Sequence, residues 1–273
     1  MRGGVAREGV RTASRGGAGR KIAARVGLIA RGVLYVLVGV LAVRIAFGEG
    51  GQQADRQGAL QELAAKPFGG FLVWAVGIGL VCMMLWRLSE AVFGAAGPDG
   101  GKTSKRLASA ARAVFYGVIA FSVLSFAAGS GGESGDQQSR DMTSKAMELP
   151  GGPWWVGAAG LAIGVAGVVI AVQAARRTFR KHLAMDGVSP KVRKTVDVLG
   201  VVGGVARGIV FAAAGGFVVY AAVRFDPAEA KGMDDTLRAL TQTPAGPWLL
   251  VAVAAGLVLF GVFSWAMARW RRV

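Results

Sequence analysis

Hydrophobic residues gather in six long runs that are separated by shorter polar stretches. A helix of about twenty apolar residues crosses the roughly 30 Å hydrocarbon layer of a bilayer, and each run is close to that length. The sequence therefore predicts an all-α integral membrane protein with six transmembrane helices. The runs are Val26–Phe47, Phe68–Trp86, Leu107–Ala128, Trp154–Ala175, Val198–Val223 and Trp248–Ala268.

Two short patterns recur three times in register, which indicates internal repetition. An Ala-Arg pair stands early in every odd-numbered run, and a Pro-containing stretch opens every even-numbered run. The pairs are Ala30-Arg31, Ala111-Arg112 and Ala206-Arg207, and the prolines, called here the Pro signposts, are Pro67, Pro150 and Pro244. Each unit contains two spans, so the three units are parallel rather than inverted.

This arrangement predicts three tandem helical hairpins at residues 22–94, 107–182 and 196–273, after a basic, flexible cytoplasmic tail at 1–21. We expect the two helices of each hairpin to pack together, and a pseudo-threefold bundle is one way to assemble the three hairpins. Apolar residues spaced along one helical face before each Pro signpost predict a short helix lying at the outer membrane interface.

Small and aromatic residues add two expectations about packing. The spacings Gly160-x-x-x-Gly164 and Gly204-x-x-x-Gly208 are typical of helices that approach closely in a membrane. Tryptophans near the ends of the spans, Trp86 among them, are expected to form aromatic belts at the two membrane surfaces. The other belt tryptophans are Trp74, Trp154, Trp155, Trp248, Trp265 and Trp270.

The formal net charge of +16 is distributed unevenly. Lys and Arg concentrate in the N-terminal tail, in the loops at 94–106 and 176–197, and at the C-terminus, whereas the other three loops are nearly neutral or acidic. This alternation follows the positive-inside rule and predicts a protein of the cell (cytoplasmic) membrane with both termini in the cytoplasm. The expected partner is a bilayer with anionic headgroups, with a membrane protein as a further candidate, and nucleic acid is not expected.

The Ala-Arg-Gly or Ala-Arg-Ala starts at 30–32, 111–113 and 206–208, together with Gly-Ala-Leu-Gln-Glu-Leu-Ala-x-x-Pro-Phe-Gly at 58–69, resemble a family of actinobacterial-type membrane proteins, the domain of unknown function 1206 family. The resemblance covers roughly residues 25–270. It implies three tandem copies of a two-helix unit and a membrane location. It implies no activity, so no functional residue is transferred from the family.

Candidate chemistry is sparse in this sequence. Cys82 and His182 are the single cysteine and histidine and stand far apart, so neither a metal site nor a cofactor is predicted. The stretch at 96–103 matches a relaxed phosphate-loop pattern, but it is a turn between two spans and lacks the α/β domain that such a loop needs. No nucleophile–base–acid set is present, so the chain is not expected to be an enzyme.

The most informative polar residues are the three repeated arginines, Arg31, Arg112 and Arg207. An arginine inside a span either extends its charged end to the headgroups or serves a function within the bundle. The first interpretation predicts a structural or partner-binding membrane component, and it is the favoured one. The alternative is that the three side chains converge and bind, or pass, an anionic solute or lipid headgroup. We also expect Arg31 to pair with Glu90 near the cytoplasmic end of the second span.

Overall fold

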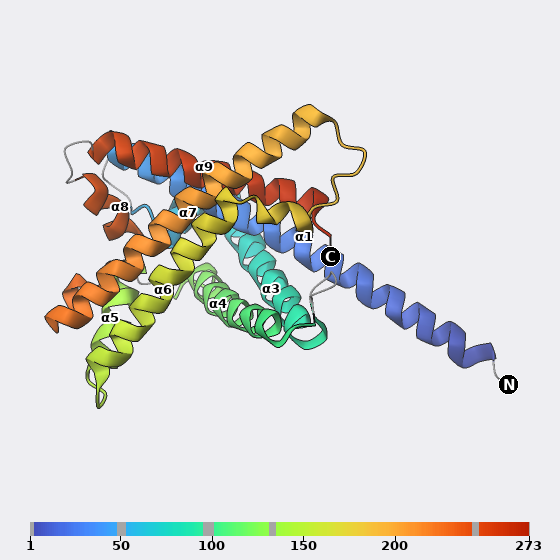
Figure 1. Ribbon diagram of the computed structural model, residues 1–273, viewed down its shortest axis with the longest axis horizontal. Helices are drawn as coiled ribbons and strands as arrows, with labels where there is room; N and C mark the ends of the chain where they lie inside the picture. Colours follow the sequence, from blue (N-terminus) through green and yellow to red (C-terminus); the bar gives the residue numbers. More distant parts are fainter. Residues whose placement is uncertain (1–2, 48–52, 95–100, 131–134, 242–245, 273) are drawn as a thin grey trace.

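The computed structural model describes residues 3–47, 53–94, 101–130, 135–241 and 246–272, with side chains from Gly19 onward except at residues 240 and 241. Six long helices carry the fold (Figure 1): α1 (Gly3–Ala46), α3 (Gly69–Phe93), α4 (Thr103–Ala127), α6 (Gly152–Ala175), α7 (Pro190–Arg224) and α9 (Gly246–Trp270). Each is long and apolar enough to cross a membrane, which confirms the prediction of six spans. Helix α1 begins at Gly3, so residues that the sequence assigned to a tail are helical here.

Three short helices connect the long ones within each repeat: α2 (Arg56–Ala64), α5 (Gly135–Met147) and α8 (Met233–Thr241). Two single turns of 3-10 helix, η1 (Thr178–His182) and η2 (Pro227–Glu229), complete the described elements. The predicted short helices are therefore present. The apolar faces of α2 and α8 point into the protein, because Leu60 and Leu237 are almost completely buried, so these two helices help to close one end of the bundle instead of lying apolar side down in lipid. Helix α5 differs, because its buried residues are Asp136 and Thr143 and its Met142 is exposed.

The first two Pro signposts lie in the tight turns that follow α2 and α5. In the first repeat, Phe68 adopts a left-handed conformation with φ of 61°, and α3 begins at the next residue. Gly69 packs so tightly that a Cβ there would lie 2.1 Å from the carbonyl oxygen of Ala64. Gly151, at the equivalent position of the second repeat, is also left-handed, with φ of 70°. Pro244 lies outside the described residues.

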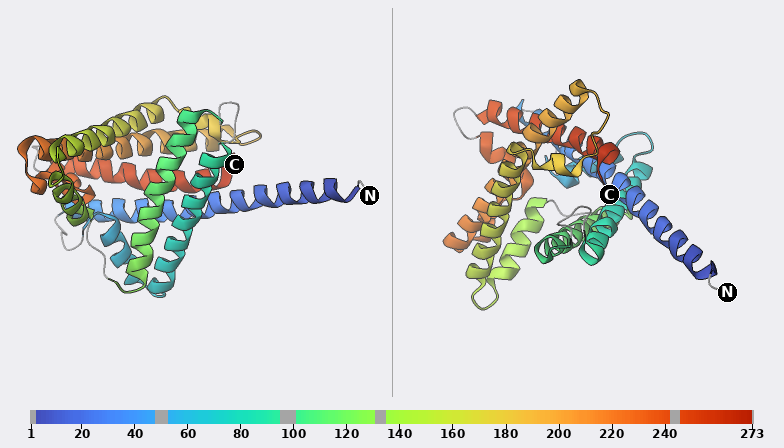
Figure 2. Two further views of the ribbon diagram at one scale, coloured as in Figure 1. Left: turned by 90° about the horizontal axis from the view of Figure 1, so that it is seen from below. Right: turned by 45° about the vertical axis from the view of Figure 1, so that its right-hand side comes forward.

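The six long helices form a ring in which neighbouring repeats pack closely. Helix α1 packs against α9, α3 against α4, and α6 against α7, and each of these contacts joins two different repeats. Within repeats, α1 packs against α3 and α7 against α9. The expected packing within the second hairpin is wrong, because α4 and α6 make hardly any contact in the described structure. Figures 1 and 2 show α4 beside α3 and α6 beside α7. The ring thus has one open side, called here the α4/α6 seam.

Glycines permit the close approach of α6 and α7. A Cβ added at Gly167 would lie 2.3 Å from the backbone nitrogen of Ala212, and one added at Gly208 would lie 2.6 Å from that of Ala171. Gly160 meets the backbone of α7 in the same way. The predicted role of the glycine spacings is therefore confirmed for this pair of helices.

Most of the tryptophans assigned to the belts are exposed, whereas Trp270 is half-buried and Trp86 is buried. Trp74, Trp154 and Trp248 are exposed on the protein surface, where lipid would meet them. Trp86 is only 1% exposed, so its assignment to a belt is wrong. The guanidinium groups of Arg87 and Arg271 lie over the Trp86 ring inside the bundle. The ring therefore makes cation–π contacts within the protein and does not contact lipid headgroups.

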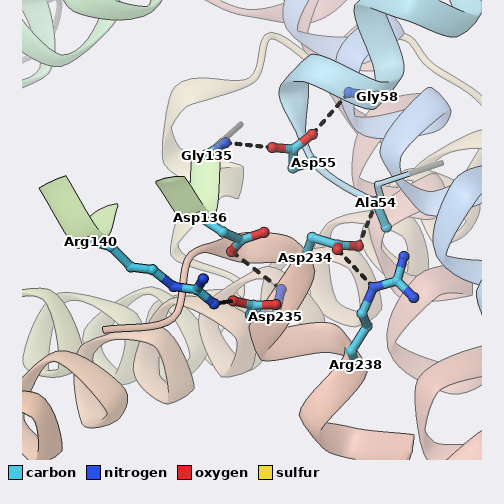
Figure 3. A network of polar contacts seen from close by, with 9 residues as sticks. All are labelled: Ala54, Asp55, Gly58, Gly135, Asp136, Arg140, Asp234, Asp235 and Arg238. Atoms are coloured by element: carbon cyan, nitrogen blue, oxygen red, sulfur yellow. Dashed lines mark hydrogen bonds and ion pairs between the residues drawn. The ribbon is translucent and has the colours of Figure 1, made fainter. Parts of the chain in front are cut away.

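Carboxylates at the end of the bundle that holds the short helices close the ring of repeats (Figure 3). The Gly135 N–H of the second repeat donates to Asp55 of the first, at 2.6 Å. The Asp235 N–H of the third donates to Asp136 of the second, at 3.2 Å, and the Ala54 N–H of the first donates to Asp234 of the third, at 2.7 Å. Each repeat gives one carboxylate and receives one, so hydrogen bonds link the three repeats in a cycle at this end.

Candidate functional site

The three predicted arginines line a single cavity. Its volume is about 290 Å³, and all six long helices contribute to its wall. Arg31 on α1 is buried, Arg207 on α7 is half-buried, and Arg112 on α4 is exposed. Because α4 borders the seam, Arg112 stands where the cavity meets the surroundings of the bundle. The structure therefore brings together all three residues that the sequence singled out.

Aromatic and hydroxyl groups hold two of these arginines. The Arg207 Nε donates to the Tyr35 hydroxyl at 2.8 Å, and the Arg31 Nε donates to Ser264 at 3.2 Å. Both guanidinium groups also lie over the ring of Phe260, at 5.1 Å for Arg31 and 5.0 Å for Arg207. For Arg112, by contrast, the described residues provide no hydrogen bond and no ion pair.

Two further arginines, Arg87 and Arg271, face the same cavity. Arg87 forms a buried ion pair with Glu90 at 2.7 Å, so the predicted Arg31–Glu90 pair is wrong. The Trp86 ring lies 4.2 Å from the Arg87 guanidinium carbon and 4.7 Å from that of Arg271. Two backbone hydrogen bonds hold the residues around Arg271 next to the cavity. The Ala184 N–H donates to the Trp270 carbonyl, and the Arg272 N–H donates to the His182 carbonyl.

This cluster is strongly cationic. Within the described residues, Glu90 is the sole carboxylate paired with any of the five guanidinium groups of the cavity. Three buried donor atoms have no acceptor in the described structure: Nη2 of Arg31, Nε of Arg87 and Nε of Arg271. Buried donors without acceptors are costly, and an anion in the cavity would supply acceptors.

Groups at the edge of the cavity respond to this charge. Burial, followed by the nearby Arg87 guanidinium, lowers the pKa of Arg271 to about 9. The group stays protonated at neutral pH, because this value still lies above 7. Burial and then the positive charge of Arg271 also lower the pKa of His182, so its imidazole is neutral at pH 7. Both pKa shifts disfavour positive charge in and beside the cavity. A bound anionic ligand would offset the same charge.

A second, apolar cavity of about 510 Å³ adjoins the arginine cavity. The two share Arg31, Phe115 and Tyr116 in their walls, and the apolar cavity extends from there to Asp55 at the opposite end of the bundle. Its surface is largely apolar, with Leu34, Val38, Leu80, Val118 and Ile119 beside several aromatic residues in its wall. Helix α4 contributes Phe115, Tyr116, Val118 and Ile119 to its wall, and none of its described lining residues comes from α6. Together the two cavities form an amphipathic space with a cationic end and an apolar end.

The remaining candidates from the sequence lie elsewhere. The nominal phosphate loop at 96–103 falls mostly outside the described residues, and α4 begins at Thr103. Cys82 lies within α3, and His182 lines the arginine cavity.

Six apolar helices in three parallel two-helix units define a multi-pass membrane protein of the tandem-hairpin class. The chain belongs to the family described as Domain of Unknown Function (DUF1206), whose model matches residues 26–94, 107–177 and 202–271. These three matches correspond to the three repeats. The chain is also 31% identical, over 242 residues, to the "Uncharacterized protein YxxB" of Bacillus subtilis (strain 168), covering 88% of this chain and 87% of that protein. No solved structure matches it.

Proposed function

We propose that this protein binds an anionic phospholipid, with the headgroup phosphate in the arginine cavity and an acyl chain in the adjoining apolar cavity. The observation that carries the proposal is that a cavity lined by guanidinium groups and a largely apolar cavity share Arg31, Phe115 and Tyr116 in their walls, in a helix ring that is open between α4 and α6. A free anion would need only the first part of this space.

Guanidinium groups suit a phosphate because their planar N–H donors can form two parallel hydrogen bonds to its oxygens. Arg112 is the natural first contact, because it is exposed and has no hydrogen-bond partner in the described residues. Arg31 offers its unpartnered Nη2 deeper in the cavity. Each hydrogen bond to a charged group contributes about 1.5–3 kcal/mol. Both anionic and zwitterionic lipids carry the phosphate, so the preference for an anionic lipid rests on repulsion between the guanidinium cluster and a cationic choline group.

The α4/α6 seam supplies a path for the lipid. A headgroup that enters sideways between these helices keeps its acyl chains in the hydrocarbon layer while the phosphate moves to the arginines. Because the positive-inside pattern assigns the arginine end to the cytoplasmic side, the lipid comes from the cytoplasmic leaflet of the cell membrane. This orientation, with both chain ends in the cytoplasm, is part of the proposal.

The proposed role is non-enzymatic. Guanidinium groups remain protonated and do not act as nucleophiles or bases, so a cavity lined by them favours binding over chemical conversion. A membrane component that holds a specific lipid remains consistent with the structural role that the sequence favours, and a protein partner at the seam is the competing occupant.

The test is native mass spectrometry of the full-length protein after delipidation in mild detergent, with added phosphatidylglycerol or phosphatidylcholine. We expect phosphatidylglycerol to be retained about tenfold more strongly, and Arg112→Gln to remove most of this preference, since about 1.4 kcal/mol corresponds to a factor of ten. Arg25→Gln is the matched control, because Arg25 is an exposed arginine at the same end of α1 and does not line the cavity.

Three outcomes refute the proposal. Equal retention of the two lipids, or equal losses in the two variants, means that general surface charge explains the binding. If millimolar inorganic phosphate displaces phosphatidylglycerol and occupies the same number of sites per chain, the cavity is a site for a free anion. A stoichiometric protein that copurifies at the seam and excludes lipid identifies a partner surface instead.

A further inference from the structure

Three carboxylates from two repeats meet at the end of the bundle opposite the arginine cavity (Figure 3). They are Asp136 in the first turn of α5 and the adjacent Asp234 and Asp235 in the first turn of α8. One oxygen from each lies within 4.8 Å of one oxygen from each of the others. Carboxylates repel each other at this separation unless a proton, a hydrogen-bond donor or a cation lies among them.

One carboxylate oxygen of Asp136 is buried without a hydrogen-bond donor in the described part of this cluster. The residue is 5% exposed, and its Oδ1 accepts from the Asp235 N–H, but its Oδ2 is buried without a hydrogen-bond donor among the described residues. Figure 3 shows its carboxyl group facing the side chains of Asp234 and Asp235. A carboxylate oxygen that is buried in this way, beside two other carboxylates, needs a hydrogen-bond donor or a cation.

The charged groups around Asp136 do not neutralise the cluster. Arg140 pairs with Asp235, and Arg238 pairs with Asp234 at 2.7 Å, so each guanidinium offsets a neighbour of Asp136. Asp55 adds a further negative charge, although it also accepts from Gly58 at 2.9 Å and from the Gly135 N–H. The negative charge of Asp136 itself has no described partner cation, and the backbone packs closely around it. A Cβ at Gly232 would lie 2.4 Å from its Oδ1.

We propose that Asp136, Asp234 and Asp235 bind a divalent cation, with Ca²⁺ as the preferred ion. Hard cations of this kind select carboxylate oxygens, and Ca²⁺ holds them at about 2.3–2.6 Å. The three oxygens lie within 4.8 Å of one another, so a small inward shift brings all three to the Ca²⁺–oxygen distance. Mg²⁺, at about 2.0–2.1 Å, requires the three oxygens to move closer together.

The bound ion would join the second and third repeats at the ring of carboxylates. Helix α5 belongs to the repeat whose long helices are separated by the α4/α6 seam, and α8 belongs to the repeat that packs against α6. A cation between α5 and α8 therefore fixes the position of the second repeat at this end, while the seam stays open to the arginine cavity.

The experiment uses the full-length protein in detergent, treated with EDTA, exchanged into buffer at pH 7.5 and titrated with CaCl₂. Calorimetry should report one ion per chain in the wild type, and the apparent Tm should rise by about 5 °C at a hundredfold excess over Kd. Asp136→Asn keeps the shape and removes the charge, so it should lose both signals. Asp141→Asn is the control on the same helix and should keep both.

A wild-type protein that binds no Ca²⁺, or an Asp136→Asn variant that binds it as well as the wild type, overturns the proposal. A protein that ignores Ca²⁺ but becomes more stable when the pH falls below 6 also overturns it, because a proton then meets the requirement of Asp136. If Asp136→Asn fails to fold, the wild-type stoichiometry from calorimetry alone decides.

Discussion

Replacing one glycine of a neighbouring pair on α7 tests whether the α6/α7 contact holds the second repeat in place. A Cβ at Gly215 would lie 2.3 Å from the backbone nitrogen of Gly164 and 2.6 Å from its Cα. A Cβ at Gly216, the next residue, has no atom within 4 Å. Gly215→Ala and Gly216→Ala therefore add the same methyl group to the same helix, once against a backbone and once into open space.

The expected magnitudes follow from these distances. Backbone atoms cannot move aside as a side chain can, so α6 and α7 must separate in Gly215→Ala, and overpacking of this kind costs about 1–3 kcal/mol. Alanine also favours the helix over glycine by up to about 1 kcal/mol. We expect Gly215→Ala to lose about 2 kcal/mol and Gly216→Ala to be neutral or slightly stabilised. At about 2–4 °C per kcal/mol, the two apparent Tm values should differ by about 5–10 °C.

Thermal unfolding in one detergent, at one scan rate, measures this difference. The fixed scan rate is needed because the unfolding of membrane proteins is commonly irreversible, and the apparent Tm then depends on the rate. Equal Tm values for the two variants would refute the close backbone contact between α6 and α7.

Three further predictions concern charge. The pKa of Asp136 in the folded state, about 6, lies above its ordinary value of 3.8, so the folded protein holds this proton more tightly than the unfolded chain. In EDTA, the stability of the wild type relative to Asp136→Asn should therefore fall as the pH rises from 4 through 6, measured as the apparent Tm. The pKa of His182, measured by NMR, should rise when phosphatidylglycerol binds and stay unchanged with phosphatidylcholine, because the lipid phosphate offsets the neighbouring arginines. Reporter domains fused at residues 52, 135 and 230 should be active outside the cell, and cytoplasmic activity at any of them contradicts the proposed orientation.

The spans and their threefold repetition were predictable from the sequence, because hydrophobic length and a recurring register determine both. The open side of the ring was not predictable. All six runs are apolar around most of their circumference, so the pattern cannot show which neighbour each helix contacts. The glycine spacings were the one feature of the sequence that indicated a helix contact, since Gly160 and Gly208 do lie where α6 and α7 meet.

The arginine site was predictable in part. Arg31, Arg112 and Arg207 were found because charge inside an apolar run is rare. Arg271 was missed because it follows the last run and reaches the cavity through backbone contacts near His182. Glu90 was assigned to the wrong arginine, since depth along a helix does not reveal direction around it, and Arg87 is the nearer neighbour on the same helix.

The departures from threefold symmetry gather around the second repeat. Four residues after each repeated arginine stands an aromatic residue, and Arg207 of the third repeat reaches the hydroxyl of Tyr35 in the first. The same relation carried around the ring assigns Tyr116 to Arg31 and Phe211 to Arg112. Phe211 has no hydroxyl, so the arginine of the second repeat is the one left without this partner. Its helix α4 is also the one that does not pack against the second long helix of its own repeat. The second repeat thus provides both the opening and, because Phe211 of the third repeat lacks a hydroxyl, an unpaired guanidinium beside it. A binding site is expected beside this opening, because the helices there make hardly any contact with each other and the ring is held together by its other helix contacts.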